Sequence, residues 1–135
     1  EEWLDFAKDL HVAWDSRLFR LYDSRLYLLP EALADKNIRS LRFLRTGLYL
    51  GEVKQKRFEP SQALAMALRK EDFALTADLK ADDERVVRYL KGETLELEDL
   101  VSSKAKGWCL VCVDGYPLGW GKLSNGTLKN KYYPG

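Results

Sequence analysis

Hydrophobic and polar positions along residues 107–130 fall into three short runs that are separated by two turn dipeptides. Asp114-Gly115 and Asn125-Gly126 both readily adopt positive φ, which is the strongest short-range signal for a two-residue hairpin loop. The sequence therefore predicts a meander of three antiparallel strands. Their expected bounds are 107–113, 116–123 and 127–132.

The first half of the chain alternates between helical and extended patterns. Trp3, Phe6, Ala7 and Leu10 form one apolar helical stripe. A hairpin is expected around Asp23-Ser24, and Pro60 suits the first position of a later helix, where its missing N–H costs nothing. The other expected elements are strands over 18–22, 25–29 and 48–54 and the helix through about residue 69.

Residues 71–81 show little pattern and are interpreted as a connecting segment. Three acidic residues at 82–84 then load the first turn of a helix that ends near Gly92. Leu95 and Leu97 predict a short strand before the meander. We therefore expect an α+β fold, with a small linking domain over 1–75 and a partly closed β-barrel over 76–135.

Charge is segregated along the 135 residues, although the net charge is only +1. Six basic residues face one acid between Arg39 and Arg57, ten acids lie between Glu71 and Asp99, and five lysines follow from Lys104 onward against Asp114 alone. Any binding of a polyanion must therefore come from local patches. Solvated faces of an ordinary soluble domain are the simpler interpretation.

The sequence lacks the motifs of several common enzymes. No Gly-rich loop joins a strand to a helix, because Gly119 and Gly121 lie inside a predicted strand. His11 is the sole histidine, and Cys109 and Cys112 have no further soft ligands with which to hold zinc. We therefore expect no catalytic, cofactor-binding or metal-binding residue in this chain.

Location and completeness follow from equally simple patterns. The chain has no apolar run long enough for a membrane span and no opening signal segment, and its two cysteines project to opposite faces of a strand. We therefore expect no membrane partner and a reducing, cytoplasmic environment. Because the chain begins with Glu1 rather than Met, it is interpreted as a fragment of a longer protein.

Three segments together resemble a known family. They are GLYLGEVK with RFEPSQALA at 47–65, YLKGE at 89–93, and the long stretch from Gly107-Trp108 to Tyr133-Pro134-Gly135 that contains VDGYPLGWGK and NGTLKN. Over roughly residues 15–135 the chain is similar to the C-terminal region of bacterial RsmF-type (Sun-family) RNA cytosine methyltransferases. In that family this region holds a small linking domain and a PUA-like RNA-binding domain.

The resemblance implies a parent enzyme that uses S-adenosylmethionine to methylate C5 of a cytosine in 16S rRNA. Its catalytic domain would lie upstream of this chain, and that domain and the rRNA of the small subunit are the expected partners. The catalytic cysteines of the family match no position here. The chain itself is thus expected to dock structured rRNA for that absent domain.

Basic and aromatic side chains are the candidates for RNA contact, through phosphate attraction and base stacking. Trp108 is expected in the interior, whereas Trp120 is assigned either to packing or to stacking. Gly119 and Gly121 either bend the strand or admit RNA. The alternative function is a protein-docking module that uses the apolar and acidic central segment. The RNA-binding candidates are Arg42, Arg45, Lys54, Lys56, Arg57, Trp120, Lys122, Lys129, Lys131 and Tyr132.

Overall fold

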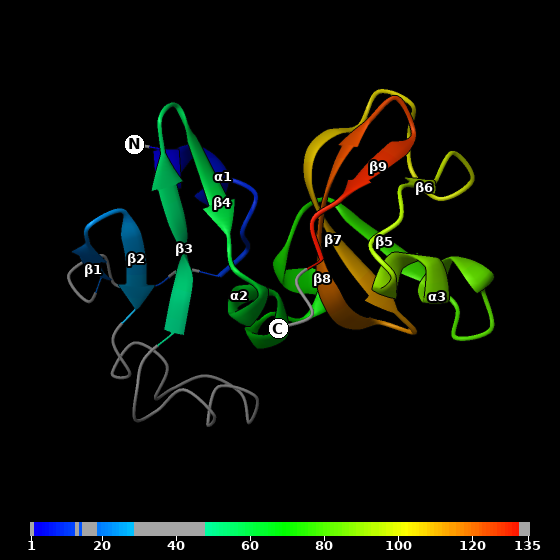
Figure 1. Ribbon diagram of the computed structural model, residues 1–135, viewed down its shortest axis with the longest axis horizontal. Helices are drawn as coiled ribbons and strands as arrows, with labels where there is room; N and C mark the ends of the chain where they lie inside the picture. Colours follow the sequence, from blue (N-terminus) through cyan, green and yellow to red (C-terminus); the bar gives the residue numbers. More distant parts are fainter. Residues whose placement is uncertain (1, 13, 15–18, 29–47, 133–135) are drawn as a thin grey trace. The chain divides into compact units, whose positions relative to one another are not determined.

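The computed structural model describes residues 2–12, 14, 19–28 and 48–132, which fold into two compact units over 1–67 and 68–135 (Figure 1). The units meet at 67/68 rather than at the expected 75/76. The reason is that the segment before residue 76 packs with the second unit. The Phe73 ring lies 4.9 Å from the ring of Trp120, and the Leu75 carbonyl accepts a 2.9 Å hydrogen bond from the amide of Leu110.

The first unit is a four-stranded antiparallel meander with two short helices. The expected hairpin around Asp23-Ser24 and the expected strand at 48–54 are both present. The sheet order is β1-β2-β3-β4, so every strand pairs with its neighbour in sequence. The elements are α1 (Glu2–Ala7), β1 (Phe19–Tyr22), β2 (Arg25–Leu28), β3 (Leu48–Lys54), β4 (Arg57–Pro60) and α2 (Gln62–Ala67).

Helix α1 covers one face of this sheet with the aromatic stripe expected from the sequence. The rings of Trp3 and Phe6 lie 5.1 Å and 5.2 Å from the ring of Phe58 on β4. Leu28 and Leu50 are fully buried on the same side. The packing of α1 on one face of the sheet thus forms part of the core of the first unit, and α2 contacts β3.

Helix α2 begins later than the sequence predicts. Pro60 is the last residue of β4, and Ser61 caps the helix because its hydroxyl accepts a 3.0 Å hydrogen bond from the amide of Leu64. The expectation that Pro60 opens the helix is therefore wrong. A serine side chain can satisfy an exposed amide of the first helical turn, which proline at this place does not do.

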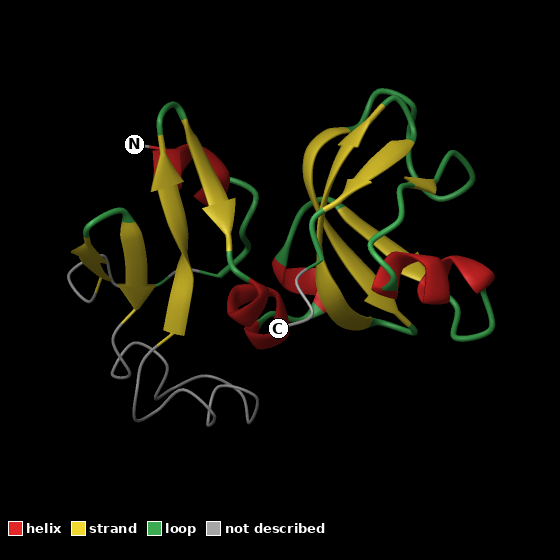
Figure 2. Cartoon of the chain, in the orientation of Figure 1, coloured by secondary structure: helices red, strands yellow, loops and turns green. Residues whose placement is uncertain are grey.

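The second unit is a five-stranded sheet of order β5-β7-β8-β9-β6. Strands β7 and β8 are long and curve strongly, so that the sheet curls toward a half-barrel (Figure 2). An α+β fold with such a sheet confirms the predicted fold class. The elements are the 3-10 helix η4 (Lys70–Asp72), β5 (Thr76–Leu79), α3 (Glu84–Leu90), β6 (Leu95–Glu96), β7 (Lys106–Val113), β8 (Tyr116–Ser124) and β9 (Thr127–Asn130).

The predicted meander is confirmed as β7, β8 and β9. Both turns use positive φ at their two central residues, with 47° and 85° at Asp114 and Gly115 and 52° and 81° at Asn125 and Gly126. These values match the mirror-image turn whose twist suits paired strands. The two dipeptides therefore fix the hairpins.

Strand β5 was missed by the sequence analysis, which expects a connecting segment at 71–81. It is only four residues long and pairs in parallel with β7, with Thr76 opposite Leu110. Ala77 and Leu79 point into a core that also contains Tyr89 of α3. So short a run carries little periodicity, and its partner lies more than thirty residues away in sequence.

Candidate nucleic-acid interface

The meander presents a basic and aromatic row on the face opposite its core. Trp108 on β7 lies directly opposite Lys122 on β8, which in turn lies directly opposite Lys129 on β9. Directly opposed residues of antiparallel strands project to the same side of the sheet. The three side chains therefore lie side by side across three strands, and we call them the lysine row.

The neighbouring positions extend this charge. Lys106 precedes Trp108 by two residues on β7, so it shares the same face. The amide of Lys131 donates a 3.2 Å hydrogen bond to the Trp120 carbonyl, which continues the register of β9 by one pair. All four lysines are exposed, and within the described part of the chain none forms an ion pair with a carboxylate.

Lys122 and Trp108 form a cation–π pair. The ammonium nitrogen of Lys122 lies 5.1 Å from the centroid of the Trp108 ring, and that ring is partly exposed. The expectation that Trp108 is interior is therefore wrong. An indole beside exposed ammonium groups offers both a stacking surface and a positive charge to a nucleotide.

Trp120 lies on the same sheet face but is only 1% exposed. Phe73 covers it at a ring distance of 4.9 Å, and Trp108 approaches it edge-on at 6.4 Å. In this conformation Trp120 has no ring face available for a base. Of the two roles considered for Trp120, its burial therefore supports core packing.

Tyr132 is half-buried and packs on the opposite, core side. Its ring lies 5.2 Å from that of Tyr89, and its amide donates a 2.7 Å hydrogen bond to the side-chain oxygen of Asn130. The same Asn130 donates to the carbonyls of Tyr89 and Glu93. Tyr132 thus closes the end of the core rather than joining the lysine row.

Gly121 belongs to the core side as well. A Cβ at this position would come within 2.6 Å of the Leu128 side chain. The missing side chain therefore makes room for Leu128. Internal packing against Leu128 is thus a third role for this glycine, in addition to strand bending and RNA approach.

Among the described RNA-contact candidates, two basic residues of the first unit form ion pairs with a carboxylate, unlike the lysines of the meander. Lys54 and Arg57 both pair with Glu59, at 3.3 Å and 3.1 Å, on the hairpin of β3 and β4. Lys56 is exposed at the tip of that hairpin, with φ at 61°. Arg42 and Arg45 lie outside the described residues.

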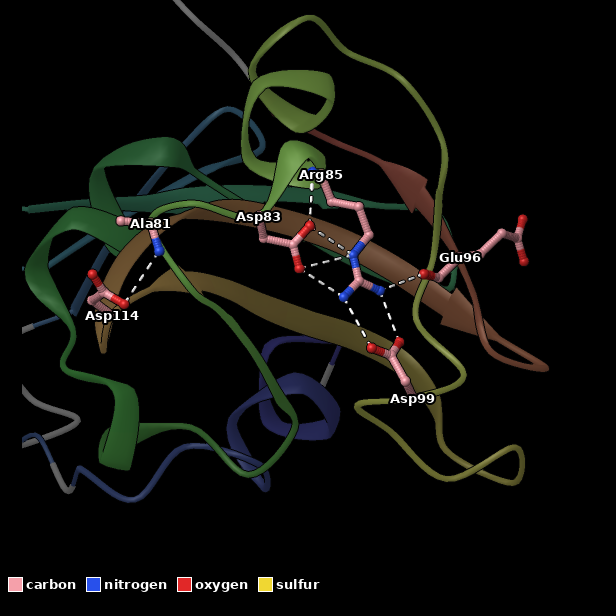
Figure 3. Close-up of polar contacts among 6 residues, drawn as sticks. All are labelled: Ala81, Asp83, Arg85, Glu96, Asp99 and Asp114. Carbon is pink, nitrogen blue, oxygen red and sulfur yellow. Dashed lines mark hydrogen bonds and ion pairs between the residues drawn. The ribbon is translucent and has the colours of Figure 1, made fainter.

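The acidic residues near α3 have a structural role. Asp83 caps α3 by accepting a 2.9 Å hydrogen bond from the amide of Arg85, whose guanidinium then binds both Asp83 and Asp99 (Figure 3). The same guanidinium donates a 2.9 Å hydrogen bond to the carbonyl of Glu96 on β6. Arg85 is thus a clamp between the start of α3 and the segment after β6, as Figure 3 shows.

Hydrogen bonds from the Arg85 side chain hold the pKa values of Asp83 and Asp99 below their usual range. Both carboxylates are therefore ionised and committed to the clamp. This agrees with the expectation that the acids at 82–84 begin a helix, and it separates them from any catalytic carboxylate pair.

A second acidic pair fixes the first meander turn. The Asp78 carboxylate on β5 accepts a 2.8 Å hydrogen bond from the Gly115 amide, while Asp114 accepts a 3.3 Å bond from the Ala81 amide (Figure 3 shows the latter). The ammonium nitrogen of Lys70 also forms an ion pair with the Asp78 carboxylate, at 2.9 Å. The β7–β8 turn is therefore anchored to the end of β5.

Among the described residues, the two cysteines belong to neither a disulfide nor a metal site. Cys109 and Cys112 are both buried and carry no disulfide. Over the described ranges, no cluster of histidine, cysteine, aspartate or glutamate could hold a metal ion. Among the described helices, none is long and apolar enough to cross a membrane.

Comparison with known proteins identifies both units. A model described as the methyltransferase RsmF PUA domain matches residues 68–135, and one described as the RsmF rRNA methyltransferase first C-terminal domain matches residues 5–68. The two matches meet where the compact units meet.

Relatives from bacteria agree with these matches. The ribosomal RNA small subunit methyltransferase F of Shewanella oneidensis is 30% identical over 125 residues, and that of Shewanella sp. strain MR-4 is 31% identical over 131 residues. Each alignment covers 93% of this chain, but the chain spans only about a quarter of either relative. The chain therefore belongs to the RsmF methyltransferase family and consists of its first C-terminal domain followed by its PUA domain.

Proposed function

We propose that this chain is the RNA-binding C-terminal module of an S-adenosylmethionine-dependent 16S rRNA cytosine-C5 methyltransferase. The relatives are named as small-subunit rRNA methyltransferases, and this chain corresponds to about a quarter of their length. Catalysis then belongs to the upstream part of the parent protein. The module would hold structured rRNA so that the target cytosine reaches that part.

The described residues form no recognisable binding site for S-adenosylmethionine. Gly119 and Gly121 lie within β8 rather than in a loop between a strand and a helix. The backbone of Gly121 also packs closely against the Leu128 side chain. Such a loop is what cradles a dinucleotide or a similar cofactor. S-adenosylmethionine is therefore assigned to the parent's catalytic domain.

The lysine row carries the proposal. Trp108, Lys122 and Lys129 align across three strands, and Lys106 and Lys131 extend the same face. Ammonium groups without carboxylate partners attract phosphates, and they read the shape of an RNA rather than its sequence. A tryptophan within the row adds a surface on which one unpaired base can stack.

We assign the basic residues of the first unit a smaller contribution to RNA binding. Lys54, Lys56 and Arg57, together with Arg42 and Arg45, keep their place as RNA-contact candidates. Because Glu59 offsets two of them, their removal should change phosphate binding less than removal of the lysine row. Replacing Arg42, Arg45, Lys54 and Arg57 by Ala in one variant measures that share.

Salt dependence of RNA binding tests the proposal. We compare the 135-residue chain with a Lys122→Gln/Lys129→Gln variant on a helix of small-subunit rRNA between low and moderate salt. Each lost phosphate contact should reduce the slope of log K against log salt by about 0.7–0.9. The double variant should therefore bind less tightly and with a flatter slope.

A matched control keeps the charge change constant. Lys80→Gln/Lys91→Gln removes two exposed lysines that lie outside the lysine row. This control should leave the slope close to that of the unmodified chain. An unchanged slope in the Lys122/Lys129 variant, or an equal loss in the control, would reject the lysine row as the RNA surface.

The alternative, a protein-docking module without RNA contact, has one observation in its favour. Helix α3 exposes Val87 and Leu90 at 55% and 42%, and Leu100 nearby in sequence is 40% exposed. Such a surface suits an apolar partner such as the upstream catalytic domain. RNA affinity that does not change with salt in the titration above would favour this alternative.

A further inference from the structure

The first unit carries an aromatic surface that the proposed function does not use. Tyr27 on β2 lies directly opposite Arg20 on β1 and Tyr49 on β3. In the next row, Tyr22 lies opposite Arg25. Because opposed residues share a face, these five side chains project to the same side of the sheet. We call this side the tyrosine face.

The three tyrosine rings form a continuous series. Their centroids are 5.9 Å apart between Tyr22 and Tyr27, and 5.1 Å apart between Tyr27 and Tyr49. Tyr22 is 63% exposed, and the other two are partly exposed. Three adjacent rings, each at least partly exposed, provide stacking positions for successive bases.

A bulge in β3 is what aligns the third ring. Arg25 pairs with Glu52 and Tyr27 pairs with Tyr49, so β3 contains one residue more than β2 between these two pairs. The bulge occurs next to Gly51, where a side chain would collide with Phe58 and with the backbone of β4. Tyr49 and Glu52 therefore share a face despite their odd spacing.

The face is distinct from the core of its unit. The other side of the same strands buries Leu26, Leu28 and Leu50, and α1 packs on that side through Trp3 and Phe6. Tyrosines that served only the hydrophobic core would be expected on the covered side. Their placement on the opposite side, where all three keep part of their surface exposed, supports a role in binding a ligand.

Charge on this face favours an anion. The row of Lys54 and Arg57 lies on the same side of β3 and β4, so it belongs to this face. The face therefore carries two carboxylates, Glu52 and Glu59, and four cationic side chains, Arg20, Arg25, Lys54 and Arg57. Glu59 is already paired with Lys54 and Arg57, and Glu52 accepts a 2.9 Å hydrogen bond from the Ser24 hydroxyl. Counted over these described residues, four cationic side chains and two carboxylates give the face an excess of formal positive charge.

Partly exposed aromatic rings interleaved with arginines on an antiparallel sheet match the chemistry of unpaired nucleotides. We propose that the tyrosine face is a second RNA surface, which stacks two or three bases of a single-stranded segment while Arg20 and Arg25 approach the phosphates. It rests on the proposed function in one respect only, namely that the chain binds RNA. The two surfaces differ in substrate, since the lysine row takes structured RNA.

Binding of a single-stranded oligonucleotide tests this inference. The probe is a fluorescent eight-nucleotide oligouridine, and the protein is the whole 135-residue chain. Tyr22→Leu/Tyr27→Leu should weaken binding by about tenfold or more, since stacking on an aromatic ring contributes substantially to the affinity for each base. Tyr22→Phe/Tyr27→Phe keeps the rings and should bind like the unmodified chain.

Controls separate stacking from folding and from the lysine row. Tyr116→Leu removes an equally exposed tyrosine from the second unit and should not change oligouridine binding. The tyrosine variants should still bind the rRNA helix used for the lysine row, whereas Lys122→Gln/Lys129→Gln should retain most of the oligouridine affinity. Failure of one surface is then distinguishable from failure of the other.

Three results would overturn the inference. They are unchanged oligouridine binding in the Leu variant, an equal loss in the Phe variant, and an equal loss in Tyr116→Leu. The first is also the result expected if the face binds a protein instead. If the Leu variant fails to fold, the unmodified chain is photo-crosslinked to oligo(5-iodouridine) instead. Adducts on Tyr22, Tyr27 or Tyr49 support the inference, whereas adducts confined to residues 68–135 refute it.

Discussion

The phenol hydroxyl of Tyr89 donates a 2.9 Å hydrogen bond to the backbone carbonyl of Trp120, and both side chains are buried. This bond joins α3 to the middle strand of the meander. Tyr89→Phe would remove one of two hydrogen bonds to this carbonyl, which also accepts from the amide of Lys131. We expect the free energy of unfolding of the second unit to fall by about 0.5–1.5 kcal/mol, measured by urea titration of tryptophan fluorescence.

Tyr116→Phe is the matched control for that change. Tyr116 is 70% exposed, so removal of its hydroxyl should alter the free energy of unfolding by less than about 0.5 kcal/mol. Equal effects of the two substitutions would show that the bond between Tyr89 and Trp120 adds nothing to stability.

The register of the meander shows how far the sequence determines the site. Each turn dipeptide fixes its own hairpin, and Asn125-Gly126 alone is enough to pair Lys122 with Lys129. On the other hairpin, the same rule would pair Trp108 with Gly121. A bulge between Val111 and Cys112 shifts the pairing, so that Trp108 lies opposite Lys122 instead.

That shift also explains why the sequence wrongly predicts an interior Trp108 and leaves the role of Trp120 open between packing and stacking. The bulge places Trp108 and Trp120 on the same face, and Phe73 from the preceding segment covers only Trp120. Neither the bulge nor this long-range contact has a signal in the local alternation of residues. The lysines of the site were therefore predictable, whereas the exposed aromatic residue was not.

Acid should destabilise the second unit through the Arg85 clamp. Hydrogen bonds from Arg85 lower the pKa values of Asp83 and Asp99 from their ordinary value of 3.8. A lowered pKa in the folded state means that the unfolded chain binds protons first as pH falls. The stabilisation is therefore complete above pH 3.8 and is lost as pH falls through the folded pKa values, which an NMR titration of the two carboxyl groups would follow.

Arg85→Gln should return both pKa values toward 3.8 and flatten the acid limb of the stability profile. At neutral pH we expect only a small loss in the free energy of unfolding, since the exposed carboxylate of Asp99 is screened by water. Arg88→Gln is the control, because its pair with Glu93 is half exposed on both sides and should contribute less. Carboxyl pKa values that stay low in Arg85→Gln would contradict the clamp.

Alkali should act through the buried thiol of Cys109. Burial, together with the neighbouring Cys112, raises the pKa of Cys109 from 9.0 to about 12. The folded state therefore keeps a proton that the unfolded chain releases near pH 9.0, so this contribution to stability is present below pH 9.0 and is lost between there and about pH 12. The limiting slope is about 1.4 kcal/mol per pH unit.

Cys109→Ala removes this ionisation, and its stability should decline less steeply with pH than that of the unmodified chain. Thiol labelling gives a second measurement at pH 8, where a buried thiol should react only as fast as the unit opens. Rapid labelling of Cys109 under native conditions, or parallel stability profiles for the two proteins, would show that this thiol is not buried in solution.

At Gly121, a role in packing against Leu128 and a role in RNA approach predict different outcomes for the same substitution. A Cβ at 121 would lie 2.6 Å from Leu128, so Gly121→Ala should overpack the core and lower the free energy of unfolding by about 1–3 kcal/mol. If this contact is the cause, Leu128→Ala should make room for the new methyl group. The effect of Gly121→Ala should then be smaller in the Leu128→Ala background than in the unmodified chain, as a double-mutant cycle measures. A glycine kept for RNA approach would instead give equal effects in both backgrounds, with a loss of RNA affinity and little loss of stability.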